Sequence, residues 1–330
     1  MKIAIIGDGG WGTALAILLG KKAEPEVCLW SAFAEYAAAM RRTHENKKFL
    51  AGISIPAPVR ITADLEEALR SAAVVILAVP SKYLRGVLKK INSCAVQKPL
   101  FISAAKGIEP QTLLRMSEVI RAELGNIRLC VLSGPNIAYE VARGVPSAAV
   151  CAGSPAHTAT AQDVLMRREF RVYTARDVVG VELAGTMKNI IAIACGIADG
   201  LGFGTNTKGA LLTRGLAEMA RLGVAMGARY DTFSGLSGMG DLVTTCLSPR
   251  SRNRCLGEEI GKGRALSVIL AGTEMVIEGV EATKAVRALS HRYQVDLPIT
   301  REVYQGLFRK KNPRRAVDSL MSRSKKNERA

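Results

Sequence analysis

The sequence predicts an α/β protein in which a doubly wound, mainly parallel sheet is followed by an all-α C-terminal domain. Three observations lead to this fold class. In the first half of the chain, short apolar segments alternate with helical segments, as in repeated βαβ units. Several of these apolar segments are continuous runs, which is typical of parallel strands buried on both faces. In the second half, helical patterns follow one another with few strand candidates between them.

The expected elements follow from these runs, of which residues 72–79 (AAVVILAV) are the clearest. In chain order, strands are expected at residues 2–7, 27–30, 72–79, 100–103 and 129–132. Helices are expected at residues 11–22, 34–42, 178–198, 208–226, 252–262, 283–294 and 299–308. We place the domain boundary within residues 173–181, which divides the chain into residues 1–180 and residues 181–330.

Length and composition are those of a folded protein. At roughly 150 residues per domain, the 330 residues correspond to about two domains. Hydrophobic residues make up 48% and charged residues 23%, which excludes a mainly disordered chain. The longest apolar run, residues 190–198, is far shorter than the ~20 residues of a membrane span, and residues 3–6 lead into glycines, unlike a signal peptide. We therefore expect a cytoplasmic protein without stable membrane association.

The cysteines and histidines show neither a disulfide framework nor the spacing of metal ligands. Seven cysteines without a C-x-x-C pair, most of them within apolar runs, indicate reduced core thiols. The three histidines are scattered along the chain. We therefore predict no metal site.

The chain is strongly basic, with 46 Lys and Arg against 29 Asp and Glu and a net charge of +17. Such a charge favours anionic partners: phosphorylated substrates, nucleic acid or an anionic membrane surface. The basic residues are spread along the chain, except for a dense tail at residues 310–315 and 323–329. We interpret the tail as a solvated helix end, with a binding arm as the alternative. Because no aromatic–basic stacking module is visible, we expect no nucleic-acid partner.

A glycine-rich turn follows the first predicted strand. Gly7, Gly9 and Gly12 form G-x-G-x-x-G in the segment GDGGWG, directly before the first predicted helix. In Rossmann-type folds these glycines permit the tight turn, the approach of the backbone to the pyrophosphate, and close helix–strand packing. The helix N-terminus then binds the phosphates. Such a turn also occurs without a ligand, but the strand before it and a second strand soon after it favour dinucleotide binding.

The choice between NAD and NADP depends on the end of the second strand. An acidic residue there binds the ribose 2′-hydroxyl of NAD. In this chain the strand ends in Leu29-Trp30-Ser31-Ala32-Phe33, which offers neither a carboxylate nor an arginine. The cofactor is therefore NAD or NADP, with NADP slightly favoured by the missing carboxylate and by the nearby Arg41 and Arg42.

Two lysines are candidates for catalysis. Lys106 follows the strand at residues 100–103, so it lies at the sheet edge where ligands bind in open α/β folds. Lys188 shares one helix face with apolar residues, which are Val181, Ala184, Ile191 and Cys195. A lysine desolvated in this way loses proton affinity and can act as a base near neutral pH. The alternatives are a solvated loop lysine at position 106 and a lysine at position 188 that extends along its helix to water.

Further polar candidates occur in the second half. Asp241 ends the glycine-rich segment GLSGMGD, where it is either the N-cap of a helix or the carboxylate that orients the lysine. Arg252 and Asn253, within Ser251-Arg252-Asn253-Arg254, supply a guanidinium and an amide suited to a phosphate group. Each of these residues alone has an ordinary structural explanation.

Taken together, these segments resemble the bacterial-type NAD(P)-dependent sn-glycerol-3-phosphate dehydrogenases over nearly the whole chain. The matching segments, in order, are residues 7–16 (GDGGWGTALA), 105–107 (AKG), 133–136 (SGPN), 185–189 (GTMKN), 213–218 (TRGLAE), 236–242 (LSGMGDL), 251–254 (SRNR) and 276–279 (VIEG). Two segments depart from the family pattern: Ser31-Ala32-Phe33 stands where members often carry Arg or His, and FLAG at residues 49–52 replaces the usual YLPG. The first departure leaves the cofactor preference open.

The resemblance implies specific roles for residues of this chain. Residues 1–180 would form the dinucleotide-binding domain and residues 181–330 the substrate-binding and catalytic domain. Residues near the cofactor would be Gly7, Gly9, Gly10, Trp11, Gly12, Lys106, Ala138, Arg252, Val276 and Glu278. Residues around glycerol 3-phosphate would be Lys106, Gly134, Lys188, Asp241, Ser251, Arg252 and Asn253. Lys188 would be the base, assisted by Lys106 and Asp241.

The implied activity is the interconversion of sn-glycerol 3-phosphate and dihydroxyacetone phosphate, which supplies glycerol 3-phosphate for glycerophospholipid synthesis. The resemblance also implies a homodimer. Two alternatives remain from the residues: a two-domain dehydrogenase of another phosphorylated hydroxy compound, and a non-catalytic nucleotide-binding protein. A protein of the second kind has no need of Lys188 and Asp241 together.

Overall fold

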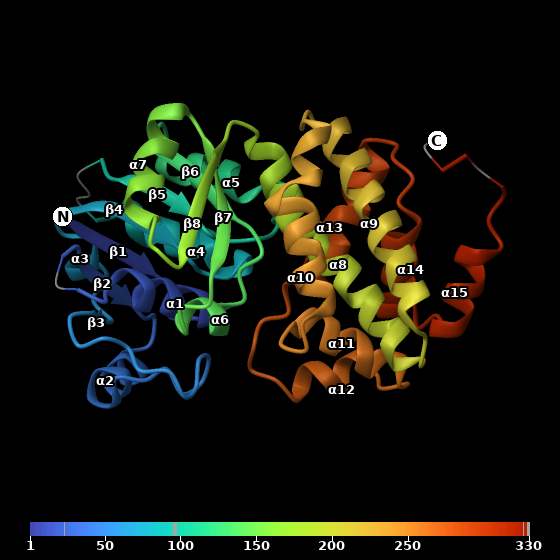
Figure 1. Ribbon diagram of the computed structural model, residues 1–330, viewed down its shortest axis with the longest axis horizontal. Coiled ribbons are helices and arrows are strands. Elements are labelled where there is room, and N and C mark those ends of the chain that lie inside the picture. Colours follow the sequence, from blue (N-terminus) through green and yellow to red (C-terminus); the bar gives the residue numbers. More distant parts are fainter. Residues whose placement is uncertain (23, 95–97, 326, 329–330) are drawn as a thin grey trace.

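A sheet half and a helical half lie side by side in the computed structural model, which describes residues 1–22, 24–94, 98–325 and 327–328 (Figure 1). The eight strands, in the order β3-β2-β1-β4-β5-β6-β7-β8, pair in parallel except for β6 and β7. Their bounds are β1 Lys2–Ile6, β2 Glu26–Trp30, β3 Arg60–Thr62, β4 Ala72–Leu77, β5 Leu100–Ser103, β6 Arg128–Ser133, β7 Ser147–Gly153 and β8 Phe170–Ala175. The predicted fold class is confirmed.

The helices of the sheet half precede residue 170, and a helical bundle follows the last strand. Those of the sheet half are α1 Gly10–Leu19, α2 Ala34–Thr43, α3 Leu65–Leu69, α4 Ser81–Asn92, α5 Met116–Leu124, α6 Ala138–Ala142 and α7 Pro155–Leu165. Those of the bundle are α8 Val178–Gly200, α9 Thr205–Ala225, α10 Asp241–Leu247, α11 Arg252–Gly261, α12 Leu266–Ala271, α13 Glu278–Arg292, α14 Pro298–Arg309 and α15 Pro313–Met321. A 3₁₀ turn (Tyr230–Ser234) and a π turn (Leu236–Gly240) precede α10.

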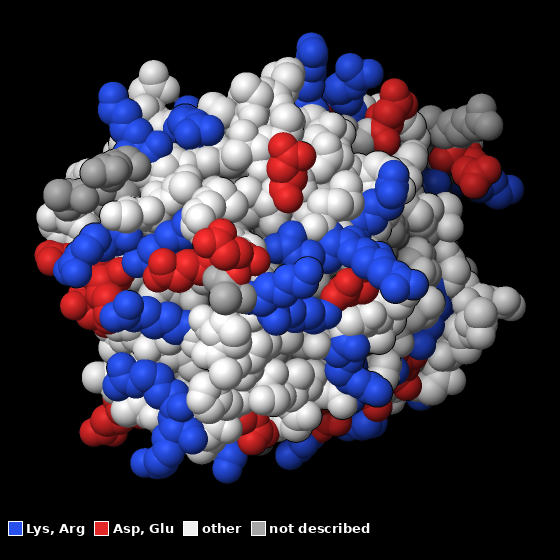
Figure 2. Space-filling view, turned by 60° about the vertical axis from the view of Figure 1, so that its left-hand side comes forward, with Lys and Arg blue, Asp and Glu red and all other residues white. Residues whose placement is uncertain are grey.

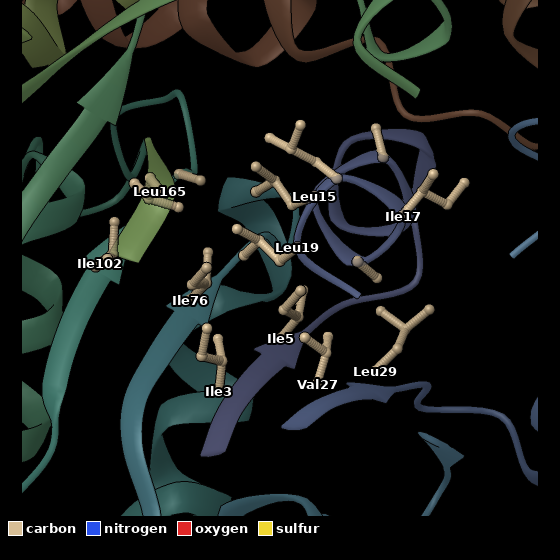
Figure 3. Close-up of a cluster of buried hydrophobic side chains, with 14 of the residues drawn as sticks. Ile3, Ile5, Leu15, Ile17, Leu19, Val27, Leu29, Ile76, Ile102 and Leu165 are labelled. Carbon is tan, nitrogen blue, oxygen red and sulfur yellow. The ribbon is translucent and has the colours of Figure 1, made fainter. Parts of the chain in front are cut away.

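Both faces of the sheet are buried, as the continuous apolar runs predict. Alternate residues of β1 point to opposite sides, with Ile3 and Ile5 in one core cluster and Ala4 and Ile6 in another. Figure 3 shows the first cluster, where Leu15 and other side chains of α1 lie over the strands. This packing holds the N-terminus of α1 at the carboxyl end of β1.

Every predicted strand and helix is present, with ends that differ by a few residues, but several elements were missed. The helix expected at 11–22 ends at Leu19, where the Gly20 N–H bonds to the carbonyl of Ala16. The helix expected at 283–294 begins five residues earlier, at Glu278. The elements that the sequence analysis did not predict include β3, β7, β8, α3, α4, α7, α12 and α15.

α8 is the central helix of the bundle, and every residue from Gly180 to Gly196 is buried. Within the described part of the chain, it is the one helix long and apolar enough to cross a membrane. The apolar segment is therefore longer than the run at residues 190–198 that the sequence analysis identified. Because 89% of the apolar window is buried inside the protein, burial in the core accounts for its composition.

Glycines bring α8 and α11 into backbone contact. A Cβ on Gly196 or Gly200 of α8 would overlap backbone oxygens of Arg254 or Glu258 in α11. The reverse holds for Gly257 and Gly261 of α11, which face carbonyl oxygens of α8. Since no side chain separates the two backbones along this seam, the helices cannot shift without a clash.

Surface charge is distributed as the sequence analysis expected. On the face in Figure 2, basic side chains lie in a broad band with acidic side chains between them. None of the residues of α15 in the basic tail is buried, and Arg323 beyond it bonds to Asp296. The described part of the tail thus holds a helix without buried residues, and its interpretation as a solvated helix end stays a prediction. All seven cysteines are free thiols, five of them buried, in agreement with the expected reduced thiols.

Candidate active site

Two lysines meet one carboxylate where the sheet and the bundle join. Lys188 Nζ donates to Asp241 Oδ1 at 2.5 Å, and Lys106 Nζ donates to Asp241 Oδ2 at 2.6 Å. Lys106 also donates to the Gly134 carbonyl at 3.3 Å. Asp241 is 1% exposed, so its charge is balanced by these two ammonium groups rather than by water. The four residues were predicted as substrate-binding, and the fold brings them together.

Separate elements carry these groups to the same place. Lys106 follows β5, Gly134 follows β6, Lys188 lies in the middle of α8, and Asp241 is the first residue of α10. The close approach of α8 to the sheet requires glycine at position 185, where a Cβ would lie 2.9 Å from the Ser133 hydroxyl. The predicted position of Lys106 at the carboxyl edge of the sheet is therefore correct.

Burial changes the proton affinity of Lys188. Its side chain is among the few charged groups of the core, with 7% exposure of the residue. Desolvation lowers the pKa of Lys188 to about 8; the nearby Lys106 charge acts in the same direction, whereas Asp241 and Glu278 oppose it. Neither alternative for the lysines holds, because Lys188 does not extend to water and Lys106 is bound to Asp241.

Asp241 does not cap its helix, which corrects one of the two interpretations of this residue. Gly240 precedes α10 as its N-cap, and both carboxylate oxygens of Asp241 are used by the lysines. One turn later in α10, Thr245 accepts a hydrogen bond from Lys188 Nζ at 2.8 Å. Sequence reasoning missed Thr245, although its spacing of four residues from Asp241 places both on one helix face.

The Ser251–Asn253 segment lies at the start of α11, and its polar groups are largely engaged within the protein. Ser251 caps α11 by accepting from the Arg254 N–H. Asn253 donates to the Asn189 side-chain oxygen at 2.9 Å and accepts from the Gly279 N–H at 3.0 Å. Arg252 is exposed and donates to the Val276 carbonyl at 2.7 Å, which leaves other guanidinium N–H groups open to solvent.

The glycine turn has the geometry that the motif predicts. Gly7 has φ of +114°, and a Cβ there would lie 2.9 Å from the backbone of Ala78. A Cβ on Gly12 would overlap the Gly7 carbonyl oxygen, so this glycine permits α1 to pack on the turn. A Cβ on Gly9 meets nothing within 4 Å, so open space lies over the N-terminus of α1. This space is where a phosphate would be bound.

The other predicted cofactor residues lie around the same edge of the sheet. Ala138, the first residue of α6, is near Gly10, since a Cβ on Gly10 would be 3.7 Å from that of Ala138. Trp11 packs on the core beside Phe170, with ring centroids 6.4 Å apart. Glu278 begins α13, where burial raises its pKa against the opposing charges of Arg252 and the two lysines. In the described part of the chain, no His, Cys, Asp and Glu group is placed to hold a metal.

Comparison with known proteins identifies the family of the chain. Residues 2–159 match the model of the NAD-dependent glycerol-3-phosphate dehydrogenase N-terminus, and residues 177–318 match that of its C-terminus. The chain belongs to the NAD-dependent glycerol-3-phosphate dehydrogenase family. One relative, glycerol-3-phosphate dehydrogenase [NAD(P)+] of Pelotomaculum thermopropionicum, is 48% identical over 99% of this chain and 95% of its own.

Solved structures agree with the assignment to the glycerol-3-phosphate dehydrogenase family. A crystal structure of glycerol-3-phosphate dehydrogenase from Coxiella burnetii has a TM-score of 0.94 and 36% identity, covering 98% of this chain and 99% of that one. A structure of D-mandelate dehydrogenase with NADH has a TM-score of 0.65 at 15% identity, which shows a shared fold alone. Family membership thus decides against a non-catalytic nucleotide-binding protein.

The residues present fit the cofactor of the glycerol-3-phosphate dehydrogenase family. The cradle of Gly7, Gly9 and Gly12 leaves room for a phosphate group at a helix N-terminus. Two buried hydroxyls, those of Ser103 and Ser133, lie at the carboxyl ends of β5 and β6 without a hydrogen-bond partner in the protein.

Proposed function

We propose that this chain catalyses the NAD(P)-dependent interconversion of sn-glycerol 3-phosphate and dihydroxyacetone phosphate. The observation that carries the proposal is the buried Lys188, paired with Asp241 and beside Lys106, at the sheet edge that also carries the glycine turn. An ammonium group with a lowered pKa at this place is suited to exchange a proton with a substrate hydroxyl. Family membership supplies the substrate class, a small phosphorylated compound.

The proton transfer falls to Lys188 in this proposal. With a pKa of about 8, a useful fraction of the amine is neutral near physiological pH and can take the proton of the secondary hydroxyl. A dinucleotide bound at the glycine turn would supply the hydride acceptor for the same carbon. In the reverse direction, the protonated amine returns the proton to the oxygen. Asp241 fixes the orientation of Lys188, and the hydroxyl of Thr245 accepts a second hydrogen bond from its nitrogen.

Lys106 has two roles in this proposal. Its charge, close to Lys188, helps to lower the proton affinity of the base. Its ammonium group also stabilises negative charge that develops on the substrate oxygen. The support is its position, because Lys106 is partly exposed at 17% while bound to the buried Asp241. It therefore reaches the side from which a ligand would approach.

The phosphate of the substrate is assigned to the N-terminus of α11. Arg252 supplies guanidinium N–H groups that are open to solvent, and the helix N-terminus adds its positive end. The side-chain amide of Asn253 is held by its hydrogen bonds with Asn189 and Gly279. Its second N–H hydrogen can donate to the phosphate. Ser251 and Gly134 complete the assigned substrate site. The cofactor is assigned to the glycine turn with Trp11, Ala138, Val276 and Glu278.

We further propose that residues 1–180 form the dinucleotide-binding domain and residues 181–330 the helical substrate-binding and catalytic domain. The transition from β8 to α8 at residues 175–178 supports this division. By its family, the chain would act in the cytoplasm as a homodimer and supply glycerol 3-phosphate for glycerophospholipid synthesis. Size-exclusion chromatography with light scattering tests the dimer.

The activity is tested by following NADH and NADPH oxidation with dihydroxyacetone phosphate. Two comparison substrates are needed: unphosphorylated dihydroxyacetone, and a longer phosphorylated ketose such as fructose 6-phosphate. We expect kcat/KM for dihydroxyacetone phosphate to exceed kcat/KM for either comparison substrate by a factor on the order of 10² or more, because the phosphate positions the carbonyl carbon. Faster turnover of the longer ketose would assign the chain to a different substrate.

A further inference from the structure

Asp8 is a buried carboxylate inside the glycine turn, between Gly7 and Gly9. It lies beside the end of β2, because its Oδ2 accepts a hydrogen bond from Ser31 Oγ at 2.6 Å. Ser31 directly follows the last residue of β2, Trp30. The proposed proton transfer does not use Asp8. Its position therefore needs a separate explanation.

The end of β2 is where a dinucleotide-binding fold recognises the ribose of the adenosine half. In NAD-binding members a carboxylate from that strand accepts a hydrogen bond from the 2′-hydroxyl, and in NADP-binding members an arginine binds the 2′-phosphate. Here the strand itself supplies only Ser31, which appeared in the sequence to leave the position without a charge. The structure places the Asp8 carboxylate against that serine, so the negative charge comes from the turn instead.

The surrounding residues hold Asp8 in this position. Its carbonyl oxygen accepts from Asn46 Nδ2 at 2.7 Å and from Thr13 Oγ1 at 3.2 Å. Asn46 is itself fixed, since its Oδ1 accepts from the Tyr36 hydroxyl at 2.6 Å. With both the backbone and the side chain of Asp8 bound, its carboxylate is pre-organised rather than free to turn away from an incoming ligand.

The cations near Asp8 do not neutralise its carboxylate, which would be needed to bind the 2′-phosphate of NADP. Lys48, the cation that acts on Asp8, is already paired with Glu274. Arg41 and Arg42 lie in the last turn of α2, seven residues or more beyond its start at Ala34. At 1.5 Å per residue, they are roughly 10 Å along the helix from the end that adjoins β2. The basis for the slight NADP preference is therefore weaker than the sequence suggested.

We propose that Asp8 makes this chain prefer NAD(H) to NADP(H), by accepting a hydrogen bond from the adenosine 2′-hydroxyl and repelling a 2′-phosphate. The inference rests on the proposed use of a dinucleotide and adds its specificity. A phosphate carrying about two negative charges at neutral pH would meet a fixed carboxylate, and such like-charge contacts strongly disfavour the wrong ligand.

The test measures binding without substrate, by titrating NADH and NADPH and following nicotinamide fluorescence. For the wild-type protein we expect a Kd for NADPH at least about tenfold above that for NADH at low ionic strength. In Asp8→Asn this ratio should fall by roughly tenfold, mainly through tighter NADPH binding. The matched control is Glu26→Gln, which removes one exposed carboxylate at the opposite end of β2 and should leave the ratio unchanged.

Folding is checked through the thermal midpoint of each variant. Burial raises the pKa of Asp8 against the effect of Ser31 and Lys48, so a neutral amide is not expected to cost stability. Ser31→Ala provides a second variant, in which the carboxylate loses its hydrogen-bond donor and the ratio should move toward one. Equal affinity of the wild-type protein for both coenzymes, or an unchanged ratio in Asp8→Asn, would overturn the assignment. Binding of neither coenzyme would instead contradict the proposed function.

Discussion

Lys188 combines two properties that an acid–base residue needs, namely a proton affinity near neutrality and a fixed orientation. Desolvation and the charge of Lys106 bring its pKa down to about 8, whereas hydrogen bonds to Asp241 and Thr245 orient its nitrogen. If Lys188 were moved to the surface, the first property would be lost, since solvent removes the desolvation effect. If Asp241 were removed, the second would be lost. The pair therefore acts as a unit.

Replacing Lys188, the proposed base, should stop the reaction while coenzyme binding persists. In Lys188→Met a side chain of similar length keeps the packing of α8 but cannot exchange a proton. We expect kcat for reduction of dihydroxyacetone phosphate to fall by a factor on the order of 10² or more, as for other lost acid–base groups. Steady-state kinetics measure the rate, and NADH titration measures the retained binding.

The control for this variant is Lys284→Met, which removes an exposed lysine paired with Glu281 on α13. Its activity should match that of the wild-type protein. A Lys188→Met variant that turns over at the wild-type rate would show that another group carries the proton.

The pH dependence of the reaction should report the pKa of Lys188. Oxidation of glycerol 3-phosphate needs the neutral amine, so kcat/KM should rise with pH through about 8 and then level off. Reduction needs the protonated form, so its kcat/KM should fall with pH through the same region. In Asp241→Asn the carboxylate that raises the pKa is gone, and both midpoints should move to lower pH. Midpoints that stay in place in this variant would contradict the pairing.

At the scale of single residues, sequence reasoning identified both lysines and Asp241 as candidates, but it missed other groups around them. Lys188 could be recognised because its helix neighbours are apolar. Thr245 was missed because a threonine on a short helix carries no signal of its own until Asp241 is placed. The charge at the end of β2 was also missed, since Asp8 lies in a different segment and only the fold brings it beside Ser31.

At the scale of elements, two glycines of the turn between β1 and α1 allow effects on stability to be separated from effects on coenzyme binding. A methyl group on Gly12 would overlap the Gly7 carbonyl, so Gly12→Ala should destabilise the protein by about 2 kcal/mol or more. Gly9 has φ of −62° and ψ of 172°, which alanine adopts, and a Cβ there meets nothing within 4 Å. Gly9→Ala should therefore keep the wild-type thermal midpoint and lose affinity for NADH by roughly tenfold or more, since its methyl group enters the space for phosphate.

Thermal unfolding and NADH titration of both variants test this prediction. Gly52→Ala is a reference variant that introduces backbone strain without a steric clash, because Gly52 has φ of +80° and no atom within 4 Å of a Cβ. If Gly9→Ala binds NADH as tightly as the wild-type protein, the phosphates do not lie over the N-terminus of α1.

The prediction of strands succeeded where the sequence has a continuous apolar run. β4 and β5 are continuous apolar runs in the centre of the sheet, whereas β3 has only three residues at its edge. β7 is rich in alanine, and β8 alternates buried and exposed residues through Tyr173, so neither resembles the central strands. The antiparallel step from β6 to β7 had no local signature. It follows from the short α6 connection, which returns the chain beside the strand it has just left.

Across the whole molecule, a buried ion pair joins the two halves at a distance from the lysines. Glu182 of α8 accepts from Arg115 at 2.6 Å and from both the backbone N–H and the hydroxyl of Ser117 at 2.7 Å. Glu182→Ala would leave Arg115 without this buried partner, and we expect a loss of about 3 kcal/mol in the free energy of unfolding. Denaturant unfolding measures this loss.

The comparison for that loss is Glu281→Ala, which breaks an exposed pair within one helix and should cost less than about 1 kcal/mol. A cost for Glu182→Ala as small as this would mean that the contact does not hold the halves together.

The docking of the halves was beyond reasoning from local patterns. Lys106 and Asp241 are 135 residues apart, and nothing near either of them predicts their contact. Only the resemblance to a family grouped them before the structure did. The change of periodicity near residue 177 predicts where the chain divides, but it gives no information about how the two parts face each other.

The seam of glycines between α8 and α11 has a consequence for the choice of substrate. α8 carries the nitrogen proposed to exchange the proton, and α11 begins with the residues assigned to the phosphate ester. The two backbones touch without intervening side chains. The distance between the main chains that carry Lys188 and Arg252 is consequently fixed by direct backbone contact. In the proposed site, a ligand with one carbon more between its alcohol and its phosphate would therefore have to be accommodated by the exposed Arg252 side chain, because the two main chains cannot move apart or together freely.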